Sequence, residues 1–189
     1  MEINNLIRVK TRWELRDWLE RNSETESFCW VIVSVTERSE VIQYLDAVEE
    51  ALCFGWIDSV KKKISATETA QRLSKRKKKS NWTELNKERA RRLDKLGLMK
   101  EGGLKILPNM QPESFMIDKD IKARLQEDEQ IYQNFINFPE LYRRIRIDTI
   151  QSYKNEPDTF NKRLDKFIEN TRKNKMYGQW NDNGRLINY

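Results

Sequence analysis

Residues 49–58 read Glu-Glu-Ala-Leu-Cys-Phe-Gly-Trp-Ile-Asp, and this stretch predicts a change from helix to strand. Gly55 can adopt the positive φ that a tight turn requires, and Trp56 then begins a strand. Upstream, Ser39 is a suitable N-cap for a helix. Its apolar face recurs at helical spacing: Val41, Leu45, Val48 and Leu52. The block therefore joins a helix to a sheet.

The neighbouring segments supply the remaining parts of that sheet. Residues 28–35 form a short, β-branched and nearly continuous apolar run, which predicts a strand buried on both faces. Thr11 and Glu14 have capping-box spacing and predict a helix over residues 11–22. Two further strands are predicted over residues 57–65 and 69–75, joined by a turn near Ala66 and Thr67.

The chain beyond Lys79 is predicted to be helical. Asn81 and Glu84 have capping-box spacing, and Gly97 suits the end of that helix. Further helices are expected over residues 102–108, twice within 118–135, over 139–153, and from 157 onward. We therefore predict an α+β fold, with a small antiparallel sheet of about three strands packed with helices and an all-helical C-terminal half. The expected domains are residues 1–110 and a helical region, 111–189, packed on it.

Composition excludes several kinds of site. The chain has no histidine and two cysteines, so it lacks His-dependent catalytic sites and a Cys/His zinc set. We expect no metal and no cofactor. No segment approaches the roughly 20 apolar residues of a membrane span, and we expect a cytoplasmic protein. Cys29 and Cys53 are then expected to be reduced and buried. The alternative of Cys53 as a nucleophile would require activation by a group such as Lys61.

The positive charge is concentrated in residues 61–79. This segment has nine Lys or Arg and one acid, a local charge of +8, whereas the whole chain carries +6, so the remaining residues sum to −2. A hairpin of the two predicted strands would collect these cations on a ribbon. The cations are Lys61, Lys62, Lys63, Arg72, Lys75, Arg76, Lys77, Lys78 and Lys79.

Three interpretations of the basic segment are open. Lysines neutralise phosphates without reading sequence, so the ribbon suits nucleic acid or another polyanion, and Trp56 or Trp82 could stack on a base. An anionic membrane surface is a further possible partner. Lysines on an edge strand also prevent aggregation, so the ribbon can equally be a solvated, edge-protecting structure.

The block at residues 49–58 also predicts a cleft. Glu50 lies near the end of the helix, and Trp56 and Asp58 share one strand face. Together with Arg72, a carboxylate there could act as a general base or bind a ligand. The alternative is that these aromatic side chains are core and that Asp58 pairs with a neighbouring cation or caps a turn.

These motifs resemble the YdeI/OmpD-associated family, often labelled bacteriocin-protection proteins. The resemblance is carried by residues 49–58, by the basic segment ending Lys78-Lys79-Ser80-Asn81-Trp82, by Asn86, and by residues 97–103. It implies no established catalytic residues and associates the chain with stress tolerance. It also directs attention to a shared surface or framework. Those residues are Trp56, Asp58, Arg72, Arg76, Ser80, Asn81 and Trp82.

Three functions remain after this reasoning. The first is a non-enzymatic binding protein whose basic ribbon binds an anionic partner, with nucleic acid as the expected partner. The second is a metal-independent enzyme or small-ligand binder with a cleft at Glu50, Trp56, Asp58 and Arg72, or one using carboxylate-bound Mg²⁺. The third is a stress-linked interaction protein with no chemistry of its own. The missing histidine favours binding over catalysis.

Overall fold

A computed structural model describes residues 2–77 and 80–189, which divide into two compact units. Unit 1 comprises residues 1–81 and 89–108, and unit 2 comprises residues 82–88 and 109–189. The elements of unit 1 are β1 (Leu6–Ile7), α1 (Arg12–Asn22), β2 (Phe28–Val33), α2 (Tyr44–Cys53), β3 (Trp56–Lys63), β4 (Thr69–Lys75) and α4 (Glu101–Leu104). Helix α3 (Glu84–Lys95) begins in unit 2 and ends in unit 1.

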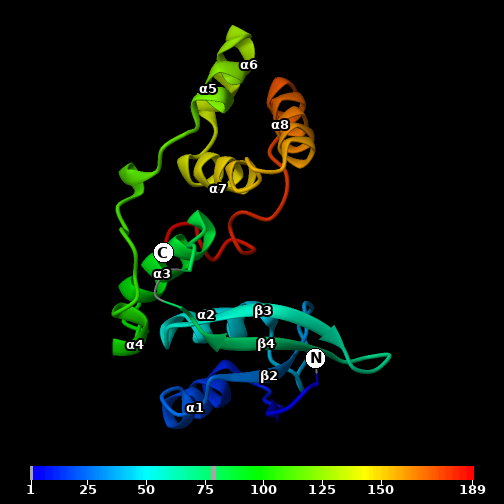
Figure 1. Cartoon of the computed structure of the whole chain (residues 1–189), viewed down its shortest axis with the longest axis vertical. Coiled ribbons are helices and arrows are strands. Elements are labelled where there is room, and N and C mark those ends of the chain that lie inside the picture. The colour runs from blue at the N-terminus through cyan, green and yellow to red at the C-terminus, as the bar shows by residue number, and fades with distance from the viewer. Residues whose placement is uncertain (1, 78–79) are drawn as a thin grey trace. The chain divides into compact units, whose positions relative to one another are not determined.

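Unit 1 contains a four-stranded mixed sheet in the order β1-β2-β4-β3 (Figure 1). The predicted α+β class is confirmed, but the sheet has one strand more than expected and is not purely antiparallel. Strand β1 runs parallel to β2, pairing Leu6 with Trp30. It has only two residues, too few for a pattern of alternation, so its pairing with β2 could not be seen in the sequence.

Each face of the sheet in unit 1 carries an apolar cluster centred on β2. On one face, Leu15 and Leu19 of α1 and Ala47 and Ala51 of α2 pack against the strands in one buried cluster. Trp56 and Leu73 belong to the same cluster. On the other face, Trp30, Ile32 and Ala70 form a second cluster. Burial on both faces explains why β2 is an almost continuous apolar run, as predicted.

Helix α2 begins later than predicted. Its first residue is Tyr44, and Gln43 is the N-cap, whereas the sequence pattern placed the start at Ser39. The intervening residues make backbone contacts of their own: the Ser34 amide donates to the Ile42 carbonyl, and the Tyr44 amide donates to the Ser34 carbonyl. These contacts with the end of β2 hold residues 41–43 in an extended conformation, although Val41 matches the apolar periodicity of the helix.

The turn between α2 and β3 depends on glycine. Gly55 has φ +76°, as its place in the sequence predicted, and a Cβ there would lie 2.6 Å from the Gly102 carbonyl oxygen. A Cβ on Gly103 would lie 2.4 Å from the Cys53 carbonyl oxygen. The start of α4 thus packs directly on the backbone that ends α2. Gly102 and Gly103 are needed for this close approach rather than only for opening a helix.

Two predicted helix caps have different outcomes. At α1, the Glu14 amide donates to Thr11 Oγ1, which confirms the N-cap. At α3, the predicted cap Asn81 is wrong, because the helix starts at Glu84 and the Asn86 amide donates to Thr83 Oγ1. Both residues have side chains suited to an N-cap, so local sequence could not choose between them.

Unit 2 is helical, as predicted for the C-terminal half. It contains a short 3₁₀ turn (Pro112–Ser114), α5 (Lys119–Gln126), α6 (Glu129–Asn137), α7 (Glu140–Gln151) and α8 (Pro157–Arg172). Its core joins Ile121, Phe135, Tyr142, Leu164 and Phe167. The sequence predicts a stripe on the last helix at Phe160, Leu164, Phe167, Ile168 and Thr171, and the last four of these residues are buried on α8. Among the described residues, no helix has both the length and the apolar character needed to cross a membrane.

Candidate functional site

The basic ribbon is formed by β3 and β4 of unit 1. The two strands pair antiparallel, and β3 is the last strand of the sheet (Figure 1). Lys61, Lys62 and Lys63 are all exposed on β3. Lys61 and Lys63 share the face of α2, where Lys61 Nζ lies 5.2 Å from the Tyr44 ring centroid, while Lys62 is on the opposite face. The ribbon therefore presents positive charge to both sides of one edge.

The other cations of the segment have separate surroundings. The Arg72 guanidinium lies over the Phe28 ring at 4.5 Å, and Lys75 Nζ donates to the Glu24 carbonyl at 2.6 Å. Arg76 is 6% exposed, whereas Lys75 and Lys77 are exposed like the three strand lysines. Lys78 and Lys79 lie outside the described residues. The seven described cations of the segment therefore do not form one continuous surface.

The residues of the expected cleft lie on different faces of the sheet. Asp58 pairs with Leu73 and Trp56 with Lys75, so Trp56 and Asp58 face the helices. Arg72 pairs with Trp30, and neighbouring residues on a strand point to opposite faces, so Arg72 lies on the other side. Asp58 accepts a hydrogen bond from the Tyr44 hydroxyl at 2.7 Å. Sequence reasoning missed Tyr44, because no local pattern joins two residues on different elements.

Trp56 is a core residue. It is 1% exposed and makes an edge-to-face contact with Trp18, with ring centroids 6.1 Å apart. Trp82, in unit 2, is 9% exposed. Neither ring is accessible to stack on a base. Asn81 is exposed, and its backbone carbonyl accepts from Arg76 Nη1 at 2.8 Å.

Glu50 lies in a buried ion cluster. Its carboxylate is fully buried and accepts from Arg12 Nε and from Arg16 Nη1, each at 2.8 Å. The adjacent Glu49 accepts from Arg92 Nη1 at 2.8 Å and from Arg12 Nη1 at 3.2 Å. Both Glu50 oxygens are thus engaged by guanidinium groups. This arrangement joins α1 to α2 and leaves Glu50 poorly placed to act as a base.

A pocket of about 540 Å³ lies beside the Gly55–Trp56 turn. Its lining includes Arg76, Lys75 and the start of α4, but not Glu50, Asp58 or Arg72. Burial lowers the pKa of Arg76 to about 10, an effect that the nearby Asp58 charge partly opposes. Arg76 Nη1 also donates to Ser80 Oγ at 3.2 Å. The pocket therefore brings together Trp56 and Arg76 of the ligand-binding candidates and Lys75 of the basic segment.

The two cysteines are buried, and the chain contains no histidine that could activate either thiol. Burial first, and then the charges of Glu26 and Glu50 respectively, raise the pKa of Cys29 and Cys53 to about 12. Among the described residues, no cluster of three or more acids or cysteines has the spacing of a metal site.

We expect both thiols to resist alkylation in the native protein. A pKa of about 12 against 9.0 lowers the thiolate fraction at pH 8 by about a thousandfold. The unfolded thiols ionise near pH 9 while the folded ones stay protonated, so the stability should fall as the pH rises above about 9. Labelling with an alkylating reagent followed by mass spectrometry checks the reactivity of the thiols, with the urea-unfolded chain as control. Urea unfolding at pH 8 and at pH 10 checks the change in stability. Rapid native labelling of Cys53 would contradict it.

Comparison with known families gives two matches. Residues 7–106, just over half of the 189-residue chain, match a family described as Domain of unknown function (DUF8412). The chain belongs to this family. Residues 114–174 match the family described as Bacteriocin-protection, YdeI or OmpD-Associated. No curated protein and no solved structure matches the chain.

The second match confirms the resemblance to YdeI/OmpD-associated proteins. It falls on residues 114–174, whereas most of the motifs that indicated the resemblance lie between residues 49 and 103, within the DUF8412 match. The ribbon, the Gly55 turn and the buried ion cluster thus all belong to the DUF8412 part of the chain. The words bacteriocin protection belong to a family name and describe no molecular activity here.

Proposed function

We propose that the protein binds nucleic acid, without catalysing a reaction, through phosphate contacts made by Lys61, Lys62, Lys63 and Lys77. The carrying observation is the run of three exposed lysines on the last strand of the sheet, with side chains on both sides of that edge. Closely spaced lysines release counterions from a phosphate backbone, which gives affinity without reading sequence. The residues outside 61–79 carry a net charge of −2, so taken together they do not attract a polyanion as this segment does.

Binding at this surface should not depend on base sequence. Trp56 and Trp82 are buried, so neither supplies the stacking platform that single-strand binders use. Phosphate contacts alone position a protein on nucleic acid but do not discriminate bases. We therefore expect similar affinity for mixed-sequence single strands and duplexes of equal charge, falling steeply with salt.

The triple change Lys61→Gln, Lys62→Gln and Lys63→Gln should remove most of this binding. Each lysine that contacts a phosphate contributes about 0.9 to the slope of log affinity against log salt for a duplex, so the slope should fall by about 2 to 3. Fluorescence anisotropy with a labelled mixed-sequence duplex, from about 50 to 200 mM salt, measures it. Lys119→Gln, Lys122→Gln and Lys175→Gln remove the same charge from exposed positions in unit 2 and should leave the slope unchanged.

Two results would contradict the proposal. One is an unmodified protein that shows no binding at about 50 mM salt, since electrostatic contacts are strongest there. The other is an equal loss in the two triple variants, which would mean that net charge rather than the ribbon decides binding. Either result would leave edge protection as the role of these lysines.

A further inference from the structure

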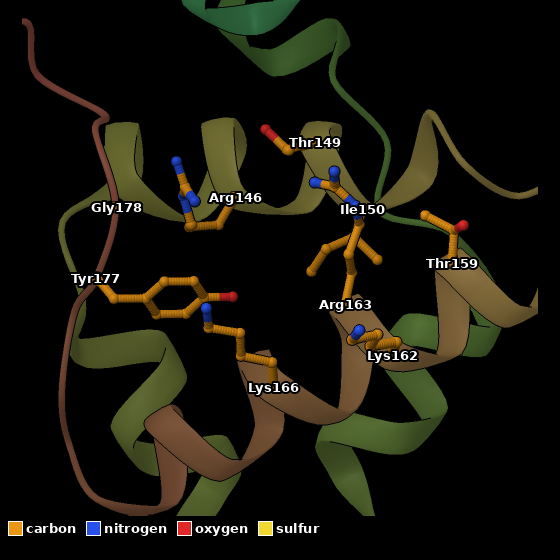
Figure 2. Close-up of a pocket in the computed structure, with 9 residues that line it drawn as sticks. All are labelled: Arg146, Thr149, Ile150, Thr159, Lys162, Arg163, Lys166, Tyr177 and Gly178. Carbon is orange, nitrogen blue, oxygen red and sulfur yellow. The ribbon is translucent and has the colours of Figure 1, made fainter.

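A second basic site lies in unit 2. A pocket of about 560 Å³ is formed between α7 and α8, with Tyr177 and Gly178 of the following segment also lining it (Figure 2). Its volume is within the range of about 300–1,000 Å³ typical of small-molecule sites. Four of the nine residues that line it are cationic and none is acidic. The cations are Arg146, Lys162, Arg163 and Lys166.

Helical spacing explains why these cations meet. On α8, three cations follow Thr159 at helical spacing: Lys162, Arg163 and Lys166 lie three, four and seven residues after it. The four side chains therefore share one face of the helix. On α7, Arg146 shares a face with Thr149 in the same way. Other residues of the two helices, such as Tyr142 on α7 and Phe167 on α8, lie in the core of unit 2. The two polar faces therefore line one cavity.

Three acids of these helices, Asp148, Asp165 and Glu169, are engaged elsewhere. Asp165 pairs with Arg124 at 3.2 Å, and Glu169 pairs with Arg172 at 2.8 Å. On α7, Asp148 accepts from the Glu84 amide at 2.9 Å. Across the part of the chain that the structure describes, none of the four pocket cations has a carboxylate within ion-pair distance.

This arrangement contrasts with three other arginines that are largely buried: Arg12, Arg16 and Arg144. Arg144, two residues from Arg146 on α7, pairs with Glu88 at 3.0 Å, and Arg12 and Arg16 in unit 1 share Glu50. Four neighbouring like charges repel one another, and the repulsion is strongest where solvent is partly excluded. An anion in the pocket would remove this cost, which makes the pocket a favourable place for one.

Two of the four cations, Arg146 and Lys166, make contacts that position them within the protein. Arg146 Nη2 donates to the Gln179 carbonyl at 2.7 Å, while its buried Nε has no hydrogen-bond partner among the described residues. The Arg146 guanidinium and Lys166 Nζ lie 5.4 and 5.2 Å from the Tyr177 ring centroid. Figure 2 shows them flanking that ring, whose hydroxyl points into the pocket. This packing reduces the entropy lost when a ligand binds.

We propose that this pocket binds a small ligand that carries two or more phosphate groups. Four cations balance more charge than one phosphate carries, and the hydroxyls of Thr149, Thr159 and Tyr177 add hydrogen-bond donors beside them. The Arg146 guanidinium and Lys166 Nζ already lie against the Tyr177 ring, so the site recognises the phosphates rather than an aromatic base. Seven of the nine lining residues lie within residues 114–174, which match the YdeI/OmpD-associated family, and Tyr177 and Gly178 follow that match. The ribbon belongs to the other unit.

Calorimetry on the full chain with inorganic pyrophosphate and tripolyphosphate tests the site. The chain should carry Lys61→Gln, Lys62→Gln and Lys63→Gln so that the ribbon does not contribute. Adding Lys162→Gln and Lys166→Gln, both at exposed positions, should weaken binding by at least about tenfold, because charge-assisted hydrogen bonds are lost. The control Lys119→Gln with Lys122→Gln should change it by less than about twofold. No binding by the parent, or equal loss in both variants, would overturn the proposal.

A complementary variant supplies the missing acid. Thr159 lies in the first turn of α8, where a carboxylate favours the helix, and is three and four residues before Lys162 and Arg163. Thr159→Glu should therefore raise the melting temperature while abolishing tripolyphosphate binding. Vesicles with a bisphosphorylated inositol headgroup, compared with free tripolyphosphate, distinguish a lipid from a soluble ligand. Binding to vesicles alone, or unchanged binding by Thr159→Glu, would overturn the proposal.

Discussion

Replacing Glu50 by Gln should lower the free energy of unfolding by about 3 kcal/mol, the largest loss that we expect from a change that preserves side-chain size. Glu50 is fully buried, and its two oxygens accept from Arg12 and Arg16. An amide keeps one acceptor but turns a donor toward a guanidinium. Arg12 then keeps Glu49 as a partner at 3.2 Å, whereas Arg16 keeps only the longer contact with Glu20 at 3.9 Å. Because Arg12 and Arg16 are 19% and 12% exposed, solvent offsets part of the cost, which places the effect at the lower end for broken buried pairs.

The matched control for Glu50→Gln is Glu20→Gln. Glu20 pairs with Lys100 at 2.6 Å, but both side chains are 44% exposed and screened by solvent, so the change should destabilise the protein far less than Glu50→Gln. Urea unfolding followed by circular dichroism measures both. If Glu50→Gln unfolds within about 1 kcal/mol of the parent, the cluster does not stabilise the contact between α1 and α2. Glu50 could act as a base only if at least one of its carboxylate oxygens left this cluster.

Gly55→Ala should also destabilise the protein by about 3 kcal/mol. The left-handed conformation costs an alanine about 1–2 kcal/mol, and overpacking adds about 1–3 kcal/mol. The overpacking follows from the 2.6 Å approach of the new Cβ to the Gly102 carbonyl oxygen, which is backbone and cannot rotate away. Both effects act at the junction that places α2 against β3.

Gly97→Ala separates these two effects. Gly97 has φ +67°, close to that of Gly55, but a Cβ there meets nothing within 4 Å. It should therefore show only the conformational cost of about 1–2 kcal/mol. The same urea unfolding measurement applies. Equal losses in the two variants would mean that α4 moves away from the turn without cost and that the close approach does not stabilise unit 1.

Local sequence was sufficient where the signal lies within one element. The β-branched run of β2, the Thr11 cap of α1 and the apolar stripe of α8 each need only neighbouring residues, and each was confirmed. Gly55 was also recognised, because few other residues adopt its conformation. The predicted start of α2 was wrong because residues 41–43 pair with the end of β2, and that pairing outweighs the helical periodicity.

The candidate site was only partly predictable. The composition and the charge count identified the basic segment, and the structure shows that Lys61–Lys63 are exposed on the last strand. The same reasoning grouped Arg72 with Asp58, but their positions in the register place them on opposite faces. Register is decided by how strands pair, which depends on the whole sheet and not on either strand alone.

The sequence by itself thus determined the helices, the apolar strands and the location of the excess charge, because those follow from the chemistry of adjacent residues. Only the tertiary structure decided which charges are paired. It buried Glu50 between two arginines contributed by another helix, and it left the cations of α7 and α8 facing one cavity without an acid. The physical reason is that ion pairing depends on distances between residues that are far apart along the chain, and packing alone sets those distances.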